Sequence, residues 1–198
     1  MPMSGGQTAA AWMGVWVVMM VAMMTPALVP VLTRYRRSVP GPGVALVGTG
    51  YYVVWSLVGG AVYLIGLAVA GAEQRWPGLV RFVPVAAGAT LLLAGCVQLT
   101  GWKRRQLARC RDCAPPSAAD AWNAARHGLR LGVNCALCCT GFMTVLLVTG
   151  MMRLVTIVLV AAAITVERLA PAPARTARIL GATILVLGAV AVVQSLRP

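Results

Sequence analysis

Long stretches without a charged residue alternate with short basic segments along this chain. About 20 apolar residues cross a bilayer as a helix, and a chain in lipid must pair its own backbone polar groups, which favours helices. The uncharged stretches predict about six spans, although the fifth, around Leu154–Val166, reaches span length only by including its neighbours. The predicted spans cover roughly residues 10–32, 44–71, 82–102, 131–149, 151–169 and 178–196.

The segments between these stretches show no domain boundary, low-complexity linker or persuasive internal repeat. The only long connection, residues 103–130, is predicted to be a cytoplasmic loop in which Pro115 and Pro116 interrupt any helix. The first ten residues lack the basic residues of a cleaved signal peptide, so we expect the first span to remain. The pattern therefore predicts an all-α, polytopic membrane helical bundle that forms one integral membrane domain over residues 1–198.

Composition supports the membrane assignment, since 60% of the 198 residues are hydrophobic and 11% are charged, against about 25% charged residues in a soluble domain. The net charge of +13 could also indicate nucleic acid as a partner, but the basic residues are not interleaved with the aromatic residues that a base-stacking surface needs. They gather instead in the first, third and fifth predicted loops, and basic loops of membrane proteins face the cytoplasm. We therefore expect a protein of the bacterial cytoplasmic (inner) membrane with both termini outside.

The fourth predicted span carries three cysteines and a methionine in the stretch CALCCTGFM: Cys135, Cys138, Cys139 and Met143. Because helix positions four residues apart lie on one face, Cys135, Cys139 and Met143 form a stripe. Gly128 and Gly132 extend that stripe, and glycine at this spacing lets a neighbouring helix approach closely. We therefore expect the sulfur atoms to face the interior of the bundle.

A second group of sulfur side chains lies in the first predicted span, in the stretch MMVAMMTP: Met19, Met20, Met23 and Met24. At 1.5 Å per residue, Met23 and Cys139 both lie about 12–14 Å below the cytoplasmic ends of their spans. Pro26 removes a helix hydrogen bond and is expected to bend the first span nearby. Soft sulfur from two helices is therefore predicted to meet at one depth, although a methionine-rich helix can also be core packing.

The donor atoms favour a particular kind of ion. Thiolates and thioethers without nearby carboxylate or imidazole groups favour a soft cation, Cu(I) before Zn(II). Cys110 and Cys113 form a C-x-x-C pair in the basic loop. A structural disulfide is not expected there, whereas metal binding or redox chemistry is expected.

Three other polar residues lie near the ends of the spans. His127, the single histidine, is either an entry ligand or a solvated residue, and Glu167 and Arg168 are expected to form an ion pair at the membrane interface.

Six short motifs are spread over nearly the whole chain: W-x-x-M-x-x-A-M-M-x-P (Trp16–Pro26), G-Y-x-x-x-W (Gly50–Trp55), Q-L-T-x-W-K (Gln98–Lys103), C-x-x-C-C-x-x-x-M (Cys135–Met143), G-x-M (Gly150–Met152) and E-R (Glu167–Arg168). Together they resemble the DUF2182 family of predicted metal-binding integral membrane proteins, some of which are called copper chaperones. The family's loop motif is similar to two cysteines with three residues between them. Here Gln106 stands at the first of these positions and Cys110 at the second, while Cys113 is additional.

These observations predict a membrane protein that binds Cu(I) and serves copper handling, relay or delivery to a membrane cuproenzyme, with the cysteines and methionines above as ligands. The sequence contains neither the phosphate-binding loop nor the phosphorylation motif of an ATP-driven pump, and no enzymatic activity is expected. Two other interpretations stay open. The chain could be an accessory or structural subunit of a larger membrane complex, or a membrane thiol–disulfide oxidoreductase that exchanges cysteine pairs.

Overall fold

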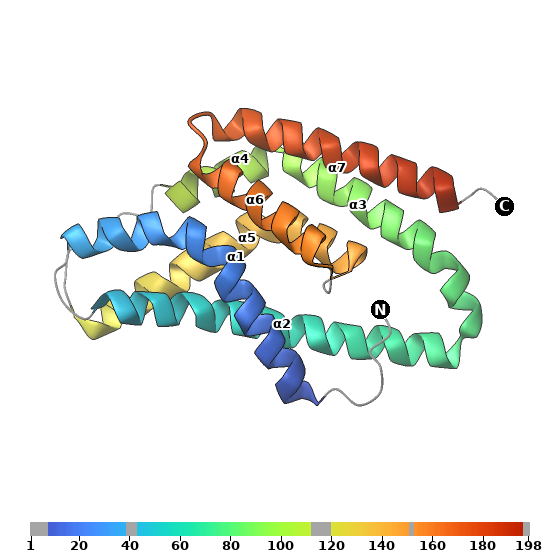
Figure 1. Ribbon diagram of the computed structural model, residues 1–198, viewed down its shortest axis with the longest axis horizontal. Helices are drawn as coiled ribbons and strands as arrows, with labels where there is room; N and C mark the ends of the chain where they lie inside the picture. Colours follow the sequence, from blue (N-terminus) through green and yellow to red (C-terminus); the bar gives the residue numbers. More distant parts are fainter. Residues whose placement is uncertain (1–7, 39–42, 112–119, 151–152, 196–198) are drawn as a thin grey trace.

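The computed structural model describes residues 8–38, 43–111, 120–150 and 153–195, and these segments form an all-helical bundle (Figure 1). Its elements in chain order are α1 (Ala9–Ser38), α2 (Gly43–Arg75), the short 3₁₀ helix η1 (Pro77–Phe82), α3 (Val83–Leu99), α4 (Gly101–Arg111), α5 (Ala121–Thr149), α6 (Leu154–Leu169) and α7 (Pro173–Ser195). The prediction of a polytopic helical bundle is confirmed.

The number of helices that could cross a membrane is four or five within the described segments, fewer than the predicted six. By length and composition α1, α2, α5 and α7 qualify singly, and α3 with α4 qualifies as a pair bent by 67°. The remaining helix, α6, has 16 residues, and about 20 are needed to cross the hydrocarbon core. In the described residues the fifth apolar stretch forms α6, and its predicted extension to residues 151–169 includes residues outside the described segments.

Basic residues gather at one end of the bundle. The last turn of α1 carries Arg36 and Arg37, and this turn lies at the same end of the bundle as α4 and the starts of α2, α5 and α7, at the left of Figure 1. The opposite end holds η1 and the C-terminal end of α7. The opposite end carries fewer basic residues, among them Arg75 and Arg81, and this unequal division is the pattern that the positive-inside rule produces.

Helix α5 forms the centre of the bundle. Its start is fixed by Asp120, whose side chain accepts a hydrogen bond from the backbone N–H of Asn123 at 2.9 Å, an N-cap that satisfies one of the free N–H groups of the first turn. Its end is fixed by Gly150, whose φ of 102° is accessible to glycine and strained for other residues. Between these points Cys135, Cys138 and Cys139 are all buried.

Helices α2 and α5 pack with their backbones in close contact, as the glycines of the α5 stripe predict. A Cβ atom added at Gly128 would overlap the carbonyl oxygen of Val47, and one added at Gly50 would lie 2.7 Å from the carbonyl oxygen of Ala125. Both obstacles are backbone atoms, which cannot move away without shifting a helix. The close approach places the side chains of α2 directly over the cysteines of α5.

Replacing Gly128 by Ala is expected to destabilise the protein by about 1–3 kcal/mol, because the new methyl group must push α2 away from α5. Gly48→Ala is the matched control, since a Cβ atom at Gly48 meets nothing within 4 Å and alanine has the higher helix propensity. Thermal unfolding in mild detergent should show a lower Tm for Gly128→Ala and an unchanged or higher Tm for Gly48→Ala. Equal melting temperatures for the two variants would contradict the close packing.

Helix α1 crosses the bundle and turns partway along its length (Figure 1). Pro26 and Pro30 lie inside this helix, where each removes a backbone hydrogen bond and favours bending. The indole N–H of Trp16 donates a hydrogen bond to the carbonyl oxygen of Trp55 at 2.9 Å and fixes α1 against α2. The methionines of this part of α1, Met19, Met20, Met23 and Met24, are all buried in the core.

Candidate metal site

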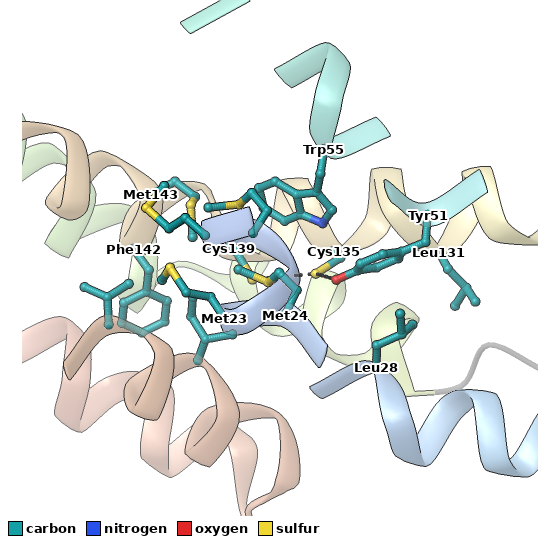
Figure 2. Packing of buried hydrophobic residues seen from close by; sticks show 14 of the residues in the cluster. Met23, Met24, Leu28, Tyr51, Trp55, Leu131, Cys135, Cys139, Phe142 and Met143 are labelled. Carbon is teal, nitrogen blue, oxygen red and sulfur yellow. Dashed lines mark hydrogen bonds between the residues drawn. The ribbon is translucent and has the colours of Figure 1, made fainter. Parts of the chain in front are cut away.

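Most of the predicted sulfur ligands belong to one buried core. We call the following residues the sulfur cluster: Met19, Met20, Met23, Met24, Cys135, Cys139 and Met143. Each is at most 8% exposed, and Figure 2 shows Met23 and Met24 of α1 beside Cys139 and Met143 of α5. The two helices therefore place these sulfur side chains in one core.

Cys135 is the most densely contacted sulfur atom of the cluster. Its Sγ lies 3.9 Å from Sγ of Cys139, one helical turn further along α5. The hydroxyl of Tyr51 donates a hydrogen bond to it at 3.0 Å (Figure 2), and Nη1 of Arg168 donates another at 3.2 Å. A sulfur atom that accepts bonds from a phenol and a guanidinium is in an environment that favours the thiolate, the form of cysteine that binds metals.

Cys138 and Cys110 lie on a different side of α5 from the sulfur cluster. They share a small buried core with Leu107 and Ala177. The thiol of Cys110 donates a hydrogen bond to the carbonyl oxygen of Asn134 at 3.2 Å. Cys110, which was predicted in a loop, is therefore on a helix and buried, and Cys113 lies outside the described residues.

A buried ion pair joins the helices next to these cysteines. The Nζ atom of Lys103 lies 3.0 Å from Oε1 of Glu167, and both side chains are at most 2% exposed. Nζ also donates a hydrogen bond to the carbonyl oxygen of Cys138 at 2.6 Å and lies 5.2 Å from the ring centre of Phe142. The prediction that Glu167 pairs with Arg168 is wrong, because neighbouring positions on α6 point to different partners: Glu167 to Lys103 and Arg168 to Cys135.

Among the described residues, His127 contacts Tyr35, and no contact between His127 and a sulfur atom is seen. Its ring stacks on Tyr35 with the centroids 5.5 Å apart, near the start of α5. The half-buried ring therefore belongs to the packing between α1 and α5.

Reasoning from periodicity and charge missed three polar residues of the site, Tyr51, Lys103 and Arg168. All three residues are positions of motifs that carry the family resemblance: G-Y-x-x-x-W, Q-L-T-x-W-K and E-R. Each of these motifs supplies a buried polar side chain that contacts an α5 cysteine or its backbone. The motifs thus mark the residues around the sulfur atoms as well as the sulfur atoms themselves.

The side chains available as ligands limit which metal ions the site could bind. Across the described segments, no three His, Cys, Asp or Glu side chains are grouped so that they could hold a metal ion. Two sulfur atoms 3.9 Å apart can nevertheless both reach one ion, since a metal–thiolate bond is about 2.3 Å long for zinc. Within the sulfur cluster, the donors available as a third ligand are methionine thioethers, which soft monovalent copper accepts.

A small cavity between α1, α4 and α6 borders one of the cysteines, Cys110. Its volume is about 140 Å³, and its lining includes Pro30 and Arg34 of α1, Cys110 of α4 and Arg168 of α6. The cavity therefore touches a thiol of the Cys110–Cys138 side and the guanidinium that contacts Cys135.

Fold and site together define a helical bundle of membrane type whose interior holds cysteine and methionine sulfur. A family model described as "PpoB2: Copper chaperone" matches residues 13–191. The chain therefore belongs to this copper chaperone family, and membership indicates a role in copper handling. Comparison with curated proteins and with solved structures gave no match.

Proposed function

We propose that the protein binds Cu(I) inside the membrane as a cargo, with Cys135 and Cys139 as thiolate ligands and a methionine of the sulfur cluster as thioether ligand. The observation that carries the proposal is the buried pair of sulfur atoms 3.9 Å apart, with two hydrogen-bond donors on Cys135. Thiolate and thioether donors favour soft metals, and the copper chaperone family supports the same cargo.

The charges around the pair favour a monovalent ion. Lys103 and Glu167 neutralise each other at 3.0 Å, which leaves Arg168 as the cation next to Cys135. Two thiolates and Cu(I) carry one net negative charge, and the guanidinium balances it. With a divalent ion such as Zn(II), the same groups would carry a net positive charge in a low-dielectric interior, where unbalanced charge is costly.

In this proposal copper enters from the cytoplasm at the basic end of the bundle. The cavity that touches Cys110 and Arg168 provides the approach. Cys110 and Cys138 receive the ion first, with Cys113 as an additional thiol of the same segment, and the sulfur cluster holds or relays it. The basic end then faces the cytoplasm of a bacterial inner membrane, and both termini face outward.

The role that follows is carrying and delivering an ion, without catalytic conversion of a substrate. Delivery to a cuproenzyme assembled in the same membrane is the outward step of this proposal, and a cytoplasmic copper chaperone is the matching donor. The resemblance to the DUF2182 family of metal-binding membrane proteins rests on the same cysteine, methionine and arginine residues and supports the same role.

Copper loading of the purified wild-type protein tests the proposal. Protein in mild detergent, reduced and free of oxygen, is expected to bind about one Cu(I) per chain, with X-ray absorption showing sulfur ligands only. Zn(II) at equal concentration is expected to bind more weakly. A wild-type protein that stays free of copper under these conditions overturns the proposal, and cysteines found oxidised in living cells by thiol trapping would favour thiol–disulfide exchange instead.

A further inference from the structure

A groove between α4 and α5 lies apart from the sulfur cluster and carries a concentrated positive charge. Its volume is about 510 Å³, and it is lined by Arg109, Arg126, Leu129, Arg130, Val133 and Asn134. Three of the six lining residues are arginines and none is acidic. A guanidinium presents its donors in a fork that fits the oxygen atoms of a phosphate group. The groove therefore has the chemistry of an anion site, and a phosphate is the group that suits it.

The apolar side of the same groove continues along the outer face of α5. Leu129, Val133 and Leu137 follow one another at helical spacing and are 40%, 46% and 39% exposed. Exposed apolar side chains on a candidate membrane span are in the position of lipid-facing residues. A ligand that fills the groove must accordingly present an anionic group to the arginines and an apolar chain to this face.

The end of the charged part of α5 marks the level of the membrane surface on this face. Arg130 is the last charged residue of α5, and the uncharged stretch that follows begins at Leu131. Basic residues next to an apolar span lie at the depth of the headgroups. Arg126 and Arg130 are therefore at the depth of lipid phosphates, and Val133 and Leu137 lie in the hydrocarbon.

We infer that this groove binds an anionic phospholipid of the membrane, with its phosphate on Arg109, Arg126 and Arg130 and an acyl chain along Val133 and Leu137. One phosphate then bridges α4 and α5. The carbonyl of Asn134, another lining residue of the groove, accepts the hydrogen bond of the Cys110 thiol. The bound lipid accordingly stabilises the contact between the two helices next to that cysteine. The inference does not depend on copper binding.

Lipid retention in native mass spectrometry tests this inference. The full chain is exchanged into micelles that contain phosphatidylglycerol and phosphatidylcholine in equal amounts, and bound lipids are counted. Wild type is expected to retain phosphatidylglycerol selectively, and Arg126→Gln/Arg130→Gln is expected to retain at least about tenfold less, since each charge-assisted hydrogen bond to the phosphate contributes on the order of tenfold. Arg130→Gln alone should give an intermediate loss and serves if the double variant is not recovered folded.

The control is Arg36→Gln/Arg37→Gln, which removes two exposed arginines from the end of α1 at the same end of the bundle. Its phosphatidylglycerol retention is expected to stay within twofold of wild type. Equal losses in the two double variants would overturn the inference, because general attraction to basic residues would then explain the binding. Displacement of the lipid by millimolar inorganic phosphate would overturn it as well, since the groove would then be a site for a soluble anion.

Discussion

Replacing Cys135 and Cys139 together by serine is expected to lower the Cu(I) affinity of the protein on the order of a thousandfold. Loss of a single outer-shell partner of a metal site costs roughly 10- to 100-fold, and this variant removes both thiolate ligands. Their sulfur atoms lie 3.9 Å apart, so one ion depends on both. The affinity is measured by competition with a Cu(I)-specific chelator under reducing conditions.

Two matched variants separate this effect from a general loss of thiols. Cys96→Ser changes an exposed cysteine on α3 and is expected to leave the affinity unchanged. Cys110→Ser/Cys138→Ser removes two thiols from the other side of α5 and should lower the affinity less than the Cys135/Cys139 double variant does. A double variant Cys135→Ser/Cys139→Ser that binds copper within tenfold of wild type would contradict the proposed ligand set.

The placement of the sulfur cluster was predictable because it depends on local geometry. The helical repeat puts Cys135 and Cys139 on one face, and a rise of 1.5 Å per residue puts Met23 at the same depth. Both rules depend only on the helix that contains the residue. They hold in the structure, where the three side chains share one buried core.

The division of the cysteines between two sides of α5 was not predictable in this way. Cys138 and Cys139 are adjacent in sequence, and the helical repeat turns them about 100° apart. The side chains that Cys138 and Cys139 contact depend on where α4 lies. The composition of α4, which is rich in arginine and lysine, predicts a solvated loop. Cys110 and Lys103 become buried only because α6 and α5 supply partners that are distant in the sequence.

Arg168 illustrates the same limit. An arginine at the end of an apolar stretch is predicted to lie at the membrane interface. The adjacent Glu167 is then the partner that the sequence suggests. The structure gives Arg168 a thiol of α5 instead, at 3.2 Å. The two residues of this contact are 33 positions apart in the sequence. A contact between distant residues produces no repeating pattern along the chain, so here a motif shared with a family is what indicates it.

The buried pair of Lys103 and Glu167 is expected to be the most sensitive polar contact for the stability of the protein. Glu167→Gln leaves the ammonium of Lys103 without its counter-charge, and Lys103→Met does the same to the carboxylate of Glu167, on a side chain that is 2% exposed. Breaking one partner of a buried ion pair costs about 3–5 kcal/mol. Thermal unfolding in mild detergent should therefore show a large drop in Tm for each single variant.

The double variant Lys103→Met/Glu167→Gln distinguishes a structural pair from a general intolerance of substitution. It removes both charges together, so it is expected to recover most of the stability that either single variant loses. Arg75→Gln, which removes an exposed charge at the end of α2, should change the stability by no more than about 0.5 kcal/mol. Losses in the two single variants that simply add in the double variant would show that the two charges do not stabilise each other. Because the double variant removes one charge of each sign and none of the proposed copper ligands, recovery of the fold should also restore much of the copper binding.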